Sequence, residues 1–140
     1  MRGFFFILAL TPGLAAADAA RVDQGLDEGC FAIDTWPLSI PVHMAERHYW
    51  TYDQAPSSHD FELIRDDTQI FLSVGDRVSC FIVDPFAPAT AETIEAALER
   101  KFSGAWSRSG DVWMVDGARP LTVRLTNTER GAGIAVETGS

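Results

Sequence analysis

The sequence predicts an α+β domain in which one well-defined helix, at about 90–103, crosses an antiparallel sheet of about five to six strands. A second, shorter helix is expected before it in the chain, at about 41–50. Three observations carry this prediction: a helical stripe with suitable ends at 90–104, two adjoining strands within 68–83, and alternating strands after the helix. Helices gathered on one face of an antiparallel sheet are typical of this class.

The chain begins with MRGFFFILALTPGLAAADAA, which has the order of a secretory signal peptide: a basic residue, a short apolar run and then small residues. A membrane-spanning helix needs about 20 apolar residues, and Pro12, Gly13 and Asp18 interrupt any such window. We expect cleavage after residue 17, before Asp18, or after residue 19. A single small domain, 18–140, would remain.

Export would place Cys30 and Cys80 in an oxidising compartment, where disulfides persist. Their pairing would close a loop of about 50 residues, worth roughly 3–4 kcal/mol in the chain-entropy model. The alternatives are two buried thiols or a redox pair, but C-x-x-C spacing is absent. The residues before Cys30 are charged and far downstream, so no lipid or membrane anchor is expected after cleavage. The predicted location is periplasmic or secreted.

Residues 18–30 are small and polar, which predicts a loose start that allows a short helix near Cys30. In the run FAIDTWPLSIP, Pro37 and Pro41 favour extended or turning backbone before them. Trp36 is expected to anchor this run. A helix can begin at Pro41, because proline is tolerated in the first turn.

Three strands are expected next, at 61–65, 68–74 and 77–83. Gly75-Asp76 fits a two-residue type II′ turn, which would set Val74 opposite Arg77 and Phe71 opposite Cys80. Both faces of this hairpin are apolar, so we expect it to be central and covered on both sides.

A helix is expected after the connection 84–89. Thr90 is a suitable N-cap, and Gly104 is a suitable stop. The apolar stripe has helical spacing and consists of Ala91, Ile94, Leu98 and Phe102.

Three further strands are expected in SGDVWMVDGARPLTVRLTNTERGAGIAVE. Asp116-Gly117 predicts a hairpin. Residues 121–126 alternate between apolar and polar side chains, as in a strand with one buried and one solvent-exposed face. A loop is expected at 127–133, before Ile134 and Val136 close the sheet.

The formal net charge is −9. Such a surface repels phosphate groups, so neither nucleic acid nor anionic lipid is an expected partner. The sequence indicates no particular oligomeric state.

The run HMAERHYWTY, residues 43–52, is the densest group of reactive side chains. Residues five apart on a helix are about 140° apart, so His43 and His48 are expected to point to different sides, and no metal site or cofactor is predicted. Tyr49, Trp50 and Tyr52 form a candidate binding patch, because such side chains are enriched at interfaces.

No catalytic residues are predicted, since the G-x-S-x-G elbow is absent and acid pairs such as Asp27-Glu28 are interpreted as solvated turns. The sequence favours a non-enzymatic binding or accessory module, with an envelope or secreted protein, or an invading hydrolase, as its partner. The alternative is a small periplasmic hydrolase that uses His48 or His59 with Asp53 or Asp60.

Overall fold

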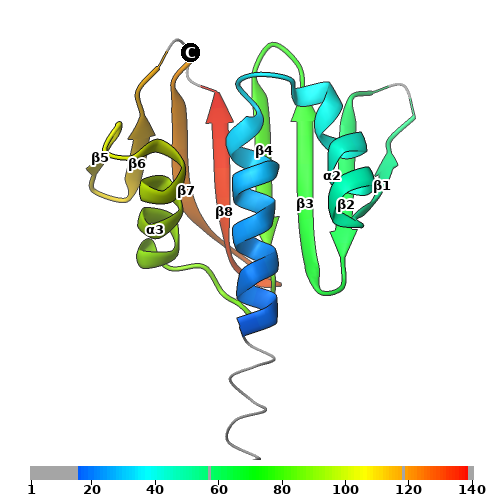
Figure 1. Cartoon of the computed structure of the whole chain (residues 1–140), viewed down its shortest axis with the longest axis horizontal. Helices are drawn as coiled ribbons and strands as arrows, with labels where there is room; N and C mark the ends of the chain where they lie inside the picture. The colour runs from blue at the N-terminus through cyan, green and yellow to red at the C-terminus, as the bar shows by residue number, and fades with distance from the viewer. Residues whose placement is uncertain (1–15, 57, 118, 139–140) are drawn as a thin grey trace, which may run out of the picture.

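The computed structural model describes residues 16–56, 58–117 and 119–138. Most of the expected signal peptide therefore lies outside the described residues. Figure 1 shows one sheet with its helices gathered on the side that faces the viewer. The α+β class is confirmed, but the antiparallel sheet has eight strands rather than five or six, in the order β1-β2-β3-β4-β8-β7-β6-β5.

The two additional strands are the edge strands β1 (Thr51–Gln54) and β5 (Trp106–Ser109). Each has four residues and lacks a buried, alternating pattern, so local sequence did not reveal it. The other strands are β2 (Asp60–Arg65), β3 (Thr68–Val74), β4 (Val78–Val83), β6 (Val112–Val115), β7 (Leu121–Thr128) and β8 (Gly131–Thr138).

The loop expected at 127–133 is wrong, because β7 and β8 continue towards each other and pair from Leu121 to Thr128. Thr128 holds the tight turn: its Oγ1 donates to the Gly131 carbonyl at 2.9 Å and accepts from the Arg130 N–H at 3.1 Å. The residues of β7 nearest the turn are polar because they are exposed. Their polarity is the reason that the sequence suggested a loop.

The expected loose start is replaced by a helix at 16–28, here called the N-terminal helix. It lies along β4 and β8 in Figure 1 and buries Val22 and Leu26. Gly25 allows the close approach, because a Cβ at this position would collide with the side chain of Ile82. Gly25, one of the small residues that suggested flexibility, instead lets the helix lie close to the sheet.

The shorter helix is α2 (Ile40–His48), which ends where Tyr49 takes a left-handed conformation. It follows two short 3-10 helices, η1 (Cys30–Ala32) and η2 (Pro37–Ser39). Trp36, expected to anchor this run, is instead 77% exposed, and Phe31 and Ile33 fill the core in its place.

The predicted helix at 90–103 is confirmed as α3 (Ala91–Phe102). Thr90 and Thr93 form a capping box, and the buried stripe includes Ile94 and Leu98. The helix ends at Ser103 and Gly104, which both have positive φ.

The predicted disulfide is confirmed: Cys30 in η1 is bonded to Cys80 in β4, with 5.2 Å between their Cα atoms. Both cysteines are buried in the layer between the helices and the sheet. The covalent bond therefore fixes the end of the N-terminal helix to the centre of the sheet.

The register expected for β3 and β4 is wrong by one residue. Val74 pairs with Val78 and Phe71 with Phe81, so the connection has three residues rather than two. Because side chains alternate along a strand, this shift moves Phe71 to the face opposite Cys80. The hairpin is central, but the helices cover only its Cys80 face; Phe71 remains 41% exposed on the other.

Candidate functional site

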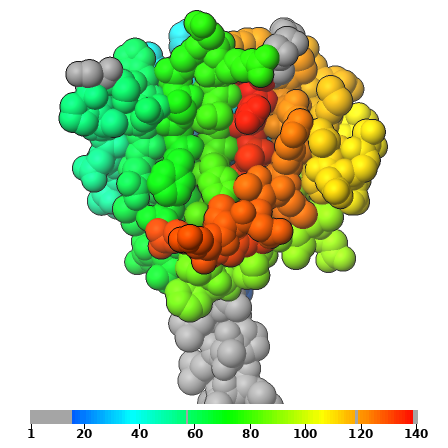
Figure 2. Space-filling model, turned by 180° about the vertical axis from the view of Figure 1, so that it is seen from behind, coloured from blue at the N-terminus to red at the C-terminus, as the bar shows by residue number. Residues whose placement is uncertain are grey.

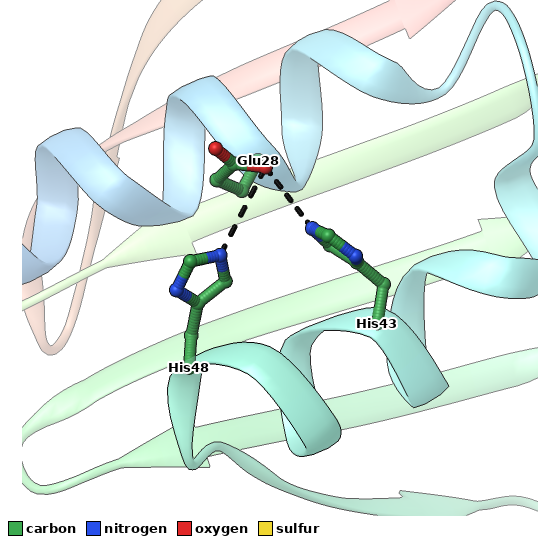
Figure 3. Close-up of side chains that lie close together, drawn as sticks. All are labelled: Glu28, His43 and His48. Atoms are coloured by element: carbon green, nitrogen blue, oxygen red, sulfur yellow. Dashed lines mark hydrogen bonds and ion pairs between the residues drawn. The ribbon is translucent and has the colours of Figure 1, made fainter.

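The N-terminal helix and α2 bring one carboxylate and two imidazoles together (Figure 3). Glu28 is at the end of the N-terminal helix. Its Oε2 lies 3.0 Å from His43 Nε2 and 3.9 Å from His48 Nε2. Within the part of the chain that the structure describes, this is the one group of three potential metal ligands, with its ligand atoms within 4.8 Å of one another.

The expectation that His43 and His48 point to different sides is therefore wrong. Their ring centroids are 5.4 Å apart, and Figure 3 shows both side chains directed at Glu28. The angular separation of two positions around a helix axis gives only the directions in which their Cα–Cβ bonds leave the helix. The long side chains converge because Glu28, on the adjacent helix, offers both of them one acceptor.

A network of hydrogen bonds centred on Gln24 fixes the orientation of His48. The Gln24 Oε1 accepts from Trp50 Nε1 at 2.9 Å and from Arg65 Nη1 at 3.1 Å. Both of these partners are donors only, so the amide Nε2 of Gln24 must be the atom that faces His48 Nδ1, at 3.2 Å. His48 Nδ1 then accepts this bond, and neutral His48 carries its proton on Nε2, the atom directed at Glu28.

Hydrogen bonding from His43 lowers the pKa of Glu28 below its ordinary value of 4.5, in opposition to partial burial, with a smaller contribution from the nearby charge of His48. Glu28 is therefore a carboxylate at neutral pH. The cluster combines a fixed acceptor, one oriented imidazole and a second imidazole at the surface, which is half-exposed.

The candidate aromatic patch divides between core and surface. Tyr49 is 80% exposed and Tyr52 is 40% exposed, whereas Trp50 is 2% exposed. Trp50 comes directly after Tyr49, where α2 ends, and its indole N–H donates a hydrogen bond to Gln24 Oε1. Trp50 is thus unavailable to a partner and belongs to the scaffold of the histidine cluster.

Among the described residues, no side-chain hydrogen bond joins the histidines of the alternative hydrolase to Asp53 or Asp60. His48 faces the carboxylate of Glu28, and no ion pair joins His48 or His59 to an aspartate among the described residues. Asp60 accepts instead from the Ser73 hydroxyl at 2.6 Å.

A separate feature lies on the uncovered face of the sheet (Figure 2). Phe71 and Phe81 are stacked there, with ring centroids 6.3 Å apart. Beside them is a hollow of about 500 Å³, whose lining includes the carboxylates of Asp60 and Glu62. We call these four residues the open-face site. Sequence reasoning missed it because it depends on the register of β3 and β4.

No protein-family model, curated protein or solved structure matches this chain.

The lowered pKa of Glu28 makes its contribution to stability depend on pH. Because the folded-state pKa is depressed, this contribution is complete above the ordinary value of 4.5 and is lost as the pH falls through the lowered value. We therefore expect Glu28→Gln to destabilise the protein at about pH 6, by less than about 1 kcal/mol because the pair is partly exposed. The difference should shrink at about pH 3.

Urea unfolding at both pH values measures this effect. Glu46→Gln, on the exposed side of α2, removes the same charge without touching the cluster and serves as the control. An equal loss of stability in both variants, or a Glu28→Gln effect that does not change with pH, would contradict the assignment.

Proposed function

We propose that the protein is an exported binding module that recognises a basic segment of an envelope or secreted protein through its open-face site. The observation that carries the proposal is the stacked Phe71–Phe81 pair beside two carboxylates.

Export is supported by two observations of different kinds, the leader and the disulfide. The first residues have the order of a cleavable leader. The Cys30–Cys80 disulfide is the kind of bond that persists in oxidising compartments. Among the described residues, no helix is long and apolar enough to cross a bilayer.

The contacts of Asp18 favour cleavage before this residue. Asp18 forms an ion pair with Arg21, and both side chains are largely buried. Removing Asp18 would leave the Arg21 guanidinium with Asp66, at 3.7 Å, as its remaining acidic neighbour. An acidic residue in the first turn also interacts favourably with the helix dipole and so stabilises the helix. A mature chain that begins at Asp18 keeps this pair.

We expect the exported protein to begin at Asp18. Intact-mass measurement of material purified from the periplasm or medium distinguishes this start from one at Ala20. Retention of the leader would contradict export, and a start at Ala20 would contradict the role of the Asp18–Arg21 pair.

The open-face site has the chemistry that recognises an arginine or lysine side chain. Aromatic faces attract cations, and carboxylates accept charge-assisted hydrogen bonds from them. Asp60 and Glu62 each bind one neighbour, Ser73 and Gln69 respectively. In each case the second carboxylate oxygen has no partner among the described residues.

The sheet around the site is built to hold the two rings. A Cβ at Gly133 would collide with the ring of Phe81, so glycine lets this ring lie over β8. Phe71 pairs directly with Phe81 across β3 and β4. Because the rings lie on central strands, they can contact a partner without rearranging the edges of the sheet.

Binding of an oligoarginine peptide, with oligoglutamate as the comparison, tests the site. We expect the mature protein to bind the basic peptide and Phe71→Ala to weaken binding about 2- to 30-fold, the range that corresponds to a cation–π contact. Glu62→Gln should also weaken it. Fluorescence anisotropy of labelled peptide measures both effects.

Matched controls separate the site from general acidity. Phe86→Ala removes another exposed ring, and Glu129→Gln removes another exposed acid. Equal weakening by Phe71→Ala and Phe86→Ala, or by the two glutamate variants, would contradict the proposal, as would equal binding of the acidic peptide.

A further inference from the structure

We propose that Glu28, His43 and His48 form a binding site for a divalent transition metal ion of the zinc type, and that Gln24 limits the affinity of this site. The site lies on the helical side of the sheet, away from the open-face site. It is independent of the proposed function.

The ligand set has the composition that zinc prefers. Two imidazoles and one carboxylate are a common three-ligand combination, which leaves the fourth position for water or a substrate atom. Glu28 and His43 line a hollow of about 150 Å³ together with Asp27, Trp36 and Lys101. This hollow gives the fourth position access to solvent.

The distances permit chelation after small side-chain movements. Ligand atoms around a tetrahedral zinc ion are about 3.3 Å apart, given bonds of about 2.0–2.1 Å. The Nε2 atoms of His43 and His48 lie 3.0 and 3.9 Å from the same carboxylate oxygen. The helices need not move, because the side chains of Glu28 and His43 are half-exposed.

Gln24 opposes the protonation state that the metal requires. A metal ion on His48 Nε2 displaces the proton from that atom, and the neutral ring then carries its proton on Nδ1. Nδ1–H would meet the N–H group of Gln24, so two donors would face each other. Turning the amide relieves this conflict but removes the acceptor that Trp50 and Arg65 share.

Metal-binding histidines almost always donate their second N–H to a carboxylate, a carbonyl group or water. Gln24→Glu would supply such an acceptor without changing the length of the side chain. One carboxylate oxygen would keep the bonds from Trp50 and Arg65, and the other would accept from His48 Nδ1–H. Since the groups that hydrogen-bond to metal ligands change metal affinity about 10- to 100-fold, we expect this variant to bind zinc more tightly by that factor.

Competition with a chromophoric chelator measures the zinc affinity of the mature, disulfide-bonded protein. Cobalt(II) adds a spectroscopic signature, because tetrahedral coordination gives strong visible bands. We expect one ion per chain, a loss of at least about tenfold in His43→Ala and His48→Ala, and no change in His59→Ala, which removes an exposed histidine elsewhere.

The outcomes separate the two parts of the proposal. Absence of binding in the wild type and in Gln24→Glu, or equal affinity of His43→Ala and His59→Ala, would overturn the metal site. Metal binding that Gln24→Glu leaves unchanged or weakens would overturn the role of Gln24. His43→Ala keeps the Gln24–His48 hydrogen bond, so its effect can be measured even if His48→Ala fails to fold.

Discussion

The disulfide between Cys30 and Cys80 is the constraint on which the arrangement of the helices depends. Cys30 follows the N-terminal helix directly, and Cys80 lies in β4, near the middle of the sheet. The bond fixes the helix end that carries Glu28, and the short connection through η1 and η2 then places α2 beside it. Without this anchor, the helix would be held by non-covalent contacts alone: the apolar packing of Val22 and Leu26, the hydrogen bonds of Gln24 and the pairing of Asp27 with Arg100. Closing a loop of about 50 residues is worth roughly 3–4 kcal/mol, a large part of the typical stability of about 5–15 kcal/mol.

The anchored helix in turn determines which chemistry appears on each side of the sheet. On the covered side, Gln24 connects the N-terminal helix to Arg65 in β2, to Trp50 and to His48. One amide thus fixes both the packing of a buried tryptophan and the proton position of an imidazole. On the uncovered side, the register of β3 against β4 places Phe71 directly beside Phe81. Aromatic rings and carboxylates meet there because no helix covers them, and the proposed recognition of a basic segment rests on this arrangement.

Much of the fold could be predicted from local patterns, whereas the sites could not. The α+β class, α3 with its capping threonine and the disulfide followed from spacing, turn residues and the presence of two cysteines. Local sequence does not predict the N-terminal helix, because the role of Gly25 becomes clear only from its close approach to Ile82, which is distant in sequence. Trp36 is expected to be buried but is exposed, because Phe31 and Ile33 fill the core in its place. Trp50 is expected at a binding surface but is buried, because Gln24 accepts its indole N–H. For the same reason the sequence alone indicates a solvated turn at Glu28, because its partners are 15 and 20 residues away.

The dependence of the helical layer on the disulfide can be measured directly by hydrogen exchange of the oxidised and the reduced protein. The account predicts that reduction removes protection first from the N-terminal helix and α2, while β4 and β8, which pair with each other in the centre of the sheet, keep most of theirs. Equal loss of protection across the helices and the central strands would contradict it. Unchanged protection of the N-terminal helix would contradict it as well, because packing alone would then hold Glu28 in place.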